Sequence, residues 1–424
     1  MKKVLMIIYS YPELHDLRLT KFVKYISSFD WEPYVVSAKT NLNEDDRRLL
    51  SPDARLIPFK DIFYKAKIKL PSTQFRTIRK SYQFIRFFSW FISACIGNLG
   101  IGWVPFNLTR IRKLIQEENI DLIYSAGLPP SCAVMGTLLK KITKRPLIID
   151  FPDAWTLDPY RPYPTKMHTY IDRFIEKNIL NMCDHIIFAT QSMAEDYFRI
   201  YPSLRVKSKV IRNGFDEEDL PKEELRLFSR FTVTYTGRFY GLRSPDPFLK
   251  ALHKILIKNK SFKQEIDIIF VGSKTESTNK VIEENGLQDV ITLTDHVPLQ
   301  ESYRYLFRSS LLLLIEPTNA LTTKVFEYLA TGKPILAIIP EGELAELIRE
   351  YSDNSYIITS GSVDEIADAI LDAYKKWKEG KLTLSSKEKV KRFRKKYNRK
   401  NLTKELADVF NMVLENPNRR MKEV

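Results

Sequence analysis

The 424-residue sequence contains few of the residues that build disulfide frameworks and metal centres. Its three cysteines, Cys95, Cys132 and Cys183, are scattered, and none belongs to a CxxC pair. This spacing excludes a disulfide framework and a cysteine-based zinc site, and it favours a reducing, cytoplasmic compartment. The five histidines form no spaced cluster of ligands. The sequence therefore predicts no bound metal and no other cofactor.

Long apolar runs are also missing. No segment approaches the roughly 20 apolar residues that a membrane-spanning helix needs. Residues 4–9 follow Lys2 and Lys3, but they are too short for a signal peptide, and no small-residue cleavage site comes after them. A first buried strand explains them better. The hydrophobic content of 44% and the charged content of 28% are typical of a globular protein, and the length allows two domains.

Positive charge is abundant, with a formal net charge of +15. A basic surface attracts phosphates, nucleic acid or anionic lipid, and net charge alone does not distinguish them. In residues 60–106, lysines and arginines alternate with aromatic residues before an almost uncharged end. This pattern suits the face of an anionic membrane, while aromatic packing in the core is an open alternative. We expect a peripheral protein on the cytoplasmic membrane face, and nucleic acid is not expected as a partner.

The first 40 residues predict a βαβ unit. Strands are expected at residues 4–9 and 31–37, with a helix at 18–29 between them, and this order favours a parallel sheet. The loop at residues 10–16 contains no glycine, so a close approach to a ligand phosphate is not expected there. Arg18, near the helix start, could bind an anionic group or could be a solvated helix residue.

Residues 311–339 carry the most informative pattern of the chain. An apolar run at residues 311–315 predicts a buried strand, and a helix follows that Thr322 or Thr323 can cap and that Gly332 ends. Free N–H groups at such a helix start lie at the carboxyl edge of the sheet and bind phosphates. Lys324 adds a charge there, and Glu327, one turn on, suits a pair of ribose hydroxyls. A solvated helix face is the alternative interpretation of both residues.

This segment resembles the donor-binding segment of family 4 glycosyltransferases, which have the GT-B fold. That family carries two glutamates eight positions apart, and the second opens the pattern Glu-Ala-Met-Ala-x-Gly-x-Pro. Here Glu327 opens Glu-Tyr-Leu-Ala-Thr-Gly-Lys-Pro, while the first position is Asn319. The resemblance implies that Glu327 contacts the ribose and that the Asn319 amide contacts the sugar hydroxyls. It also includes Leu321, Thr322 and Thr323 among the donor-binding residues.

A second motif supports the same resemblance. Thr236-Gly237-Arg238 follows a predicted strand at residues 231–235, and Arg243 lies five positions later. The family has Gly-Arg and then lysine at this spacing, and both cations are directed at the donor diphosphate. Arg243 keeps the charge, and its planar guanidinium can bind two phosphate oxygens. Further donor contacts are expected at the ends of two other strands: Gly272, His296 and Val297, of which the last two would face the nucleobase.

On the acceptor side, the resemblance points to the loop after a strand at residues 146–150. Related transferases have a His-Asp or Arg-Asp pair there, and this chain has Pro152 and Asp153. Asp153 could act as a general base or orient the acceptor hydroxyl, or it could be a helix N-cap. Trp155 could stack on a sugar or pack internally. Together with Arg18, these residues form the predicted acceptor side.

The resemblance implies an α/β protein with two Rossmann-like domains that face a central cleft. Residues 1–205 would form the acceptor-side domain, with 60–106 as a membrane-facing insertion, and residues 206–390 would bind the nucleotide sugar. Residues 391–424 would form terminal helices that return to the first domain. The expected activity is transfer of a sugar from a nucleotide-diphosphate sugar to a glycan or lipid-linked acceptor, with retention of configuration, in polysaccharide biosynthesis. Arg238, Arg243 and Lys324 would stabilise the departing diphosphate without a metal.

Two other functions stay open at this point. A nucleotide-sugar epimerase or hydrolase could use the same donor site with water as the acceptor. A non-catalytic membrane-binding or nucleic-acid-binding protein could have kept the fold, because a fold does not guarantee an activity. Asn319 and the glycine-free first loop are the features that keep these alternatives open.

Overall fold

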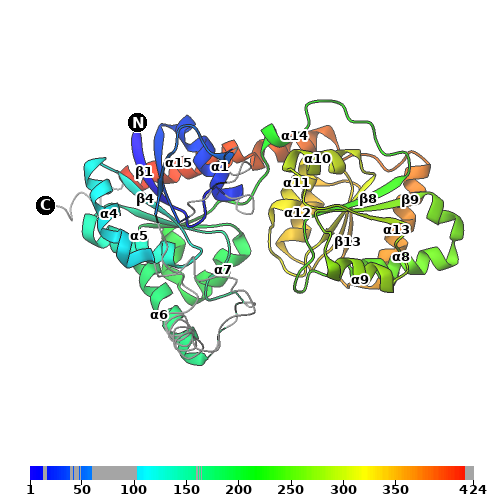
Figure 1. Ribbon diagram of the computed structural model, residues 1–424, viewed down its shortest axis with the longest axis horizontal. Coiled ribbons are helices and arrows are strands. Elements are labelled where there is room, and N and C mark those ends of the chain that lie inside the picture. The colour runs from blue at the N-terminus through cyan, green and yellow to red at the C-terminus, as the bar shows by residue number, and fades with distance from the viewer. Residues whose placement is uncertain are drawn as a thin grey trace, which may run out of the picture. The chain divides into compact units, whose positions relative to one another are not determined.

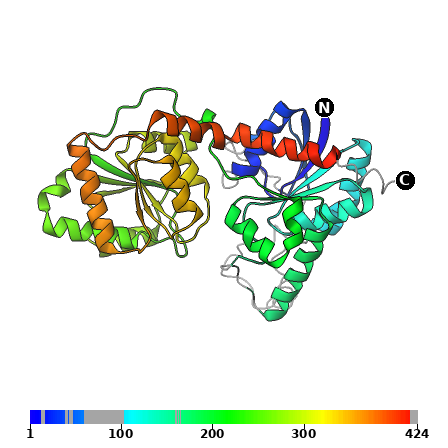
Figure 2. The same cartoon turned by 180° about the vertical axis from the view of Figure 1, so that it is seen from behind.

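We analysed a computed structural model of the chain (Figures 1 and 2). The structure describes residues 1–12, 17–38, 42, 47, 49–59, 103–158, 161, 163 and 165–415. The chain divides into two compact units. Unit 1 comprises Met1–Arg212 and the segment from Leu402 onward, and unit 2 comprises Asn213–Asn401.

Unit 1 is built on a parallel sheet of seven strands in the order β3-β2-β1-β4-β5-β6-β7. Every neighbouring pair of strands is parallel, so helices connect them across the faces. The strands are β1 (Lys2–Ile7), β2 (Trp31–Ser37), β3 (Arg55–Pro58), β4 (Leu122–Ala126), β5 (Leu147–Phe151), β6 (His185–Phe188) and β7 (Ser208–Val210). The helices are α1 (Leu17–Ile26), α4 (Val104–Glu117), α5 (Ser131–Thr143), α6 (Lys166–Met182), α7 (Gln191–Ile200) and α15 (Arg399–Glu415).

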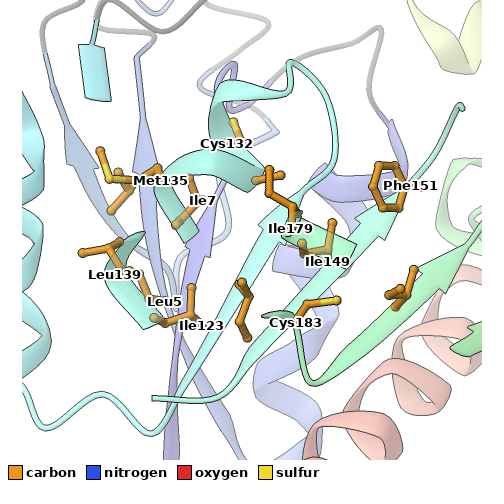
Figure 3. Close-up of a cluster of buried hydrophobic side chains, with 14 of the residues drawn as sticks. Leu5, Ile7, Ile123, Cys132, Met135, Leu139, Ile149, Phe151, Ile179 and Cys183 are labelled. Carbon is orange, nitrogen blue, oxygen red and sulfur yellow. The ribbon is translucent and has the colours of Figure 1, made fainter. Parts of the chain in front are cut away.

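Both faces of this sheet are buried, because successive strand residues point to opposite sides and nearly all of them are apolar. Leu5 and Ile7 of β1 face one cluster, which α5 and α6 complete. Figure 3 shows these two side chains beside Met135 and Leu139 of α5. Alternate residues of the same strand face a second cluster, which α1 and α15 complete.

From Leu402 onward the last helix, α15, belongs to unit 1, although it lies more than 200 residues after the strands that it covers. The Phe410 ring packs edge-on against Trp31 at 5.1 Å between ring centroids. At its far end, Lys2 Nζ donates a hydrogen bond to Asn411 Oδ1 at 2.7 Å. Figure 2 shows this helix in red beside the blue N-terminal elements of the same unit. The two ends of the chain therefore build one hydrophobic core.

Unit 2 has a parallel sheet of six strands in the order β10-β9-β8-β11-β12-β13, with apolar clusters on both faces. Its strands are β8 (Phe231–Thr236), β9 (Ile266–Val271), β10 (Ile291–Leu293), β11 (Leu311–Ile315), β12 (Ile335–Ile338) and β13 (Tyr356–Ile358). Its helices are α8 (Asp246–Lys258), α9 (Glu276–Glu284), α10 (Leu299–Arg308), α11 (Thr323–Thr331), α12 (Glu343–Tyr351), α13 (Val363–Lys378) and α14 (Lys387–Tyr397).

Several elements differ from the sequence-based expectations. Strands β3 and β7 were not expected, because each is a short edge strand without a long apolar run. The predicted boundary at 205/206 falls inside a 3₁₀ helix, Pro202–Lys207, which precedes β7 in unit 1. The predicted start of the returning segment, at residue 391, falls inside α14 of unit 2.

Most of the basic-aromatic stretch at 60–106 lies outside the described residues. Its last four residues are described. Trp103 is fully buried and stacks on Phe59 with 4.4 Å between ring centroids, whereas Phe106 is exposed. Within the described ranges, none of the helices combines the length and the apolar character that crossing a bilayer requires.

Candidate active site

The central strands of unit 2, β8 and β11, are neighbours, and each is followed by a predicted donor-binding motif. Gly237 comes directly after β8 and has a φ of 97°, in the region that favours glycine. A Cβ atom on Gly237 would lie 2.8 Å from Lys324 Cε and 2.9 Å from Lys324 Nζ. The structure therefore brings the two motifs together at the carboxyl edge of the sheet, and the positive φ favours glycine at this position.

Lys324 is held at this edge by an aromatic side chain. Its Nζ donates a hydrogen bond to the Tyr235 hydroxyl at 2.7 Å, and the Tyr235 ring stacks on Phe239 with 4.2 Å between centroids. Burial, and then the nearby Arg243 guanidinium, lower the pKa of Lys324 to about 7, against the opposing effect of Glu316 and Glu327. A bound anion would favour the charged form of this lysine.

Arg243 is buried and forms an ion pair with Glu316. Its Nη1 also donates to the Tyr240 hydroxyl at 2.8 Å. Its Nε is buried and has no hydrogen-bond partner among the described residues. Sequence analysis did not select Glu316, although a charged residue directly after the apolar strand β11 was a signal for it. One nitrogen of Arg243 thus keeps an unused donor beside the site.

Arg238 differs from Arg243 in its surroundings. The Arg238 side chain is exposed, and it forms no ion pair or side-chain hydrogen bond with any described residue. Only its backbone carbonyl takes part, accepting a hydrogen bond from the Tyr235 hydroxyl at 3.2 Å. The guanidinium is therefore free of protein partners within the described part of the chain.

Helix α11 begins directly after the β11 loop, as predicted, and Gly332 ends it with a φ of 73°. Thr322 is the N-cap residue, but the expected hydroxyl cap is wrong, because its side chain makes no capping hydrogen bond. The helix is tied to β8 instead by Tyr328, whose hydroxyl accepts a hydrogen bond from the Thr236 N–H at 2.9 Å. No side-chain oxygen at Thr322 therefore competes with a ligand for the first-turn N–H groups of α11.

The remaining predicted residues of this segment are placed as follows. Glu327 is buried at 8% exposure, one turn beyond Lys324. Thr323 is the first residue of α11 and is partly exposed. The Leu321 side chain belongs to the apolar core of unit 2, and its carbonyl accepts a hydrogen bond from Asn213 Nδ2 at 3.0 Å. A side-chain contact between Leu321 and a ligand is therefore excluded.

Asn319 occupies the loop between β11 and α11. Its Oδ1 atom is buried and has no hydrogen-bond partner among the described residues. The side chain lies against Gly342, where an added Cβ would come within 2.6 Å of the amide. This amide oxygen therefore has an unused hydrogen-bond acceptor, which a ligand could reach only if the loop moved.

The loops after β9 and β10 meet at the same edge of the sheet. The Gly272 N–H donates to Thr294 Oγ1 at 3.0 Å, and the Lys274 N–H donates to the Thr294 carbonyl at 3.2 Å. His296 is exposed and Val297 is partly buried in the loop that leads to α10. These two residues follow β10, and one strand, β9, lies between β10 and β8 in the sheet.

In unit 1, the structure gives Arg18 a different environment from the one predicted. Its side chain is 3% exposed and makes a two-pronged ion pair with Asp150, in which both N–O distances are 3.0 Å. Its Nη1 donates to the Arg212 carbonyl at 3.0 Å, and the Tyr124 hydroxyl donates to Asp150 at 2.6 Å. Sequence analysis missed Asp150, the residue next to the end of β5. Arg18 is thus a buried structural residue and is not available to an acceptor anion.

The other two acceptor-side candidates, Asp153 and Trp155, both lie in the loop after β5, and they differ in exposure. Asp153 is exposed, as a contact with an acceptor requires. The expectation that Trp155 stacks on a sugar is wrong, because its side chain is fully buried and its Nε1 donates a hydrogen bond to Asp172 Oδ2 at 3.2 Å. It packs in the core and cannot stack on a sugar. In the described part of the chain, no three His, Cys, Asp or Glu side chains form a group that could hold a metal ion.

Profiles of known protein families match both halves of the chain. The profile described as Glycosyl transferases group 1 matches residues 230–376, which include β8 to α13. The profile described as Glycosyltransferase Family 4 matches residues 72–219 in the other half of the chain. The chain is a family 4 glycosyltransferase. It transfers a sugar from a nucleotide-sugar donor, and its family retains the anomeric configuration.

The fold of the transferase is GT-B, and solved structures agree along nearly the whole length. A glycosyltransferase from Rickettsia africae superimposes with a TM-score of 0.68 at 12% identity, covering 98% of this chain and 99% of its own. HepE from Anabaena, solved with UDP-glucose, gives 0.67 at 15% identity and covers 97% and 100%. WaaG, a glycosyltransferase involved in lipopolysaccharide biosynthesis, gives 0.60 at 11% identity and covers 96% and 99%. No curated protein sequence matches the chain.

The pKa of Lys324 predicts how the transferase responds to pH. The Lys324 side chain is mostly charged below about pH 7 and mostly neutral above it, so a donor diphosphate at this edge of the sheet would be attracted by it only at the lower pH. We expect kcat/KM for the donor to fall as the pH rises from 6 to 8.5. In Lys324→Arg the side chain stays charged throughout this pH range, so the fall in kcat/KM should disappear, even if the rate itself is lower. If kcat/KM of Lys324→Arg falls with pH as in the wild-type enzyme, the titrating group is not Lys324.

Proposed function

We propose that unit 2 binds the diphosphate of the donor between Gly237 and the first turn of α11. The observation that carries this proposal is the contact of Lys324 with Gly237 at the start of a helix that has no side-chain cap. Backbone N–H groups, a helix dipole and a lysine then face one anion. The exposed Arg238 supplies a further cation from the same edge of the sheet.

The proposed chemistry follows from the charge that develops during transfer. Cleavage of the bond between the sugar and the diphosphate leaves negative charge on the nucleoside diphosphate and positive character on the sugar ring. Arg238, Lys324 and the α11 amino end stabilise the departing diphosphate, and no metal is required. Retention places the acceptor on the leaving-group side, where a phosphate oxygen takes the proton of the acceptor hydroxyl. The acceptor oxygen then forms the new bond to the anomeric carbon.

Two side chains would recognise the remainder of the donor. Glu327, buried one turn along α11, would accept hydrogen bonds from both ribose hydroxyls. The unpartnered Oδ1 of Asn319 would accept one hydrogen bond from a sugar hydroxyl. An amide there carries no negative charge, so it binds a neutral sugar without repelling the diphosphate. His296 and Val297 would line the side of the nucleobase.

A screen of nucleotide sugars by thermal shift tests this donor site. A nucleotide sugar at 100 times its Kd should stabilise the enzyme by about 2.7 kcal/mol, which raises the melting temperature by several degrees. Glu327→Gln should lose most of that shift, because an amide replaces a carboxylate that accepts from two hydroxyls. Glu346→Gln on the neighbouring helix is an exposed control and should keep it. The donor site is refuted if no nucleotide sugar stabilises the wild-type enzyme.

The acceptor is proposed to be a glycan or a lipid-linked glycan on the cytoplasmic face of a membrane, in polysaccharide biosynthesis. The similarity of fold to WaaG, which is involved in lipopolysaccharide biosynthesis, is compatible with that class of acceptor. The exposed Asp153 would orient the acceptor hydroxyl. Product analysis without an acceptor separates transfer from the epimerase or hydrolase alternative, which would release a changed or free sugar from the donor alone.

Membrane attachment is proposed for the basic-aromatic stretch at 60–106. We expect the enzyme to pellet with vesicles that contain phosphatidylglycerol, and to pellet less in 0.5 M salt, because exposed charges are screened. Replacing Arg76, Arg79 and Lys80 by glutamine should weaken pelleting about tenfold or more. The control replaces Lys258, Lys260 and Lys280 in unit 2 and should leave pelleting unchanged. Equal pelleting with neutral vesicles would contradict the proposal.

A further inference from the structure

Unit 2 contains a pocket at the end of α11 opposite to the proposed donor site. It has a volume of about 880 Å³ and is lined by Gly332 and Lys333, by α14, and by the segment from Glu217 to Leu227. Helix α11 has nine residues, so about 13 Å along the helix separates this pocket from the first turn at Lys324. Figure 1 shows α14 in the same unit as α11, and the two helices are in contact. The volume is in the usual range for a small-molecule site.

Lys333 is the buried cation of this pocket. Its side chain is 7% exposed, and its ammonium forms no ion pair or hydrogen bond with any described residue. Burial alone lowers the pKa of Lys333 to about 8. No acid of the described chain pairs with this ammonium at the pocket wall, so an anion in the pocket would be its counter-ion.

Helix α14 adds three more cations without partners. Lys387, Lys391 and Lys395 recur every four residues, so they share one face of the helix, and all three line the pocket. They are exposed, and none of them forms an ion pair within the described chain. By contrast, Lys389 and Arg392 lie outside the lining and pair with acids. The unpaired charge of this helix is thus concentrated on the pocket.

The carboxyl end of α11, which would repel an anion, is already neutralised. The Arg394 guanidinium donates to the Ala330 carbonyl from Nε at 2.9 Å and from Nη2 at 2.7 Å. The Gly332 carbonyl accepts from the Ser385 N–H at 2.8 Å. The negative end of the helix dipole therefore does not oppose an anion at Lys333.

The rest of the lining combines apolar side chains with three glutamates. Leu227 and Leu384 are 57% and 55% exposed, and these two large apolar side chains face the pocket. Three exposed glutamates also line the pocket: Glu217, Glu223 and Glu224. Glu217 accepts from Asn398 Nδ2, and Glu223 pairs with Arg304. Five cations against three acids leave the lining positive, with an apolar wall beside them.

We propose that this pocket binds an amphiphilic phosphate, in which the phosphate group pairs with Lys333 and the α14 lysines while a hydrocarbon chain covers the leucines. The phosphate supplies the partner that the buried ammonium lacks. The chain removes from water the apolar surface of Leu227 and Leu384. Such a ligand is either a membrane phospholipid or a dispersed phosphate ester. Both sources present the same chemistry to the pocket, and this site is separate from the donor site.

Calorimetric titration of the full chain with dodecyl phosphate, below its micelle concentration, tests the proposal. We expect one bound molecule per chain, binding weakened at least tenfold in Lys333→Met and in Lys391→Gln, and unchanged binding in Arg392→Gln, the adjacent residue outside the lining. Saturation with the nucleotide donor should not compete. Inorganic phosphate should bind at least tenfold more weakly, because it lacks the chain, and dodecyl maltoside should not bind, because it lacks the charge.

Equal affinity for dodecyl phosphate in wild type, Lys333→Met and Lys391→Gln would overturn the proposal, and so would equal binding of dodecyl maltoside. Vesicles distinguish the two sources of the ligand. If Lys333→Met also weakens binding to phosphatidylglycerol vesicles, the pocket takes a phospholipid. If only the dispersed ester responds to the substitution, the natural ligand is a soluble amphiphile. Melting of both variants at the wild-type temperature, with unchanged turnover in the absence of amphiphile, shows that they are folded.

Discussion

Replacing Arg238 by alanine is expected to lower kcat/KM by about 10²–10³, the usual effect of removing one group that stabilises transition-state charge. The Arg238 side chain is exposed and pairs with no described residue, so the free energy of unfolding should change by less than about 0.5 kcal/mol. Most of the loss should fall on kcat, because the charge on the diphosphate grows as the bond to the sugar breaks. Steady-state kinetics with the donor identified by thermal shift measure this.

Arg230→Ala is the matched control for this prediction. Arg230 is also exposed and lies just before β8, at the opposite edge of the same sheet, where it pairs with Asp267 at 3.1 Å. Its removal should leave turnover within about twofold of wild type, as surface pairs contribute little. Both variants are assayed with and without EDTA, and turnover should not depend on the chelator. If Arg238→Ala and Arg230→Ala have the same turnover, Arg238 does not take part in the reaction.

Replacing Arg18 by methionine is expected to destabilise unit 1 by about 3–5 kcal/mol, because it leaves the fully buried Asp150 without its cation. For a unit of this size, that corresponds to roughly 6–20 °C in melting temperature. Urea denaturation followed by tryptophan fluorescence reports on this unit, since Trp31, Trp103 and Trp155 are all buried in it. Replacing Asp150 by leucine in the same chain should restore part of the stability, since it removes the unpaired charge.

The matched control is Arg55→Met in the same unit. Arg55 pairs with Glu32 at 2.9 Å, but its side chain is 56% exposed, so its loss should cost less than about 1 kcal/mol. The comparison separates burial from the presence of an ion pair. Equal destabilisation by Arg18→Met and Arg55→Met would show that the Asp150 pair is not structural.

Features that depend on residues close together in the sequence were predicted correctly. The apolar run that forms β11, the glycine that ends α11 and the βαβ opening each depend on neighbouring residues, and the structure confirms all three. The family resemblance supplied the fold class and the class of reaction, and the family profiles and solved structures confirm these two. Residues 391–397 were expected in a terminal helix that returns to the first domain, whereas they belong to α14 of unit 2.

What sequence reasoning missed are pairs of residues that folding brings together. Arg18 and Asp150 are 132 positions apart, and Arg243 and Glu316 are 73 apart, so no local pattern couples them. The same difficulty explains the error at Trp155. An aromatic residue in a loop after a strand looks exposed until its partner, Asp172 on α6, is known. The available signal for these ion pairs was a charged residue at the end of a buried strand.

The chain passes between the two units twice, once at Arg212/Asn213 and once at Asn401/Leu402. A chimaera that exchanges donor preference with a relative therefore needs two junctions, so that the central segment is replaced and the host keeps its own α15. A single junction would join a foreign final helix to the host sheet, and Trp31 would lose the ring of Phe410 against which it packs. Evolution by swapping gene halves meets the same obstacle, because the last helix would have to be inherited together with the first strands.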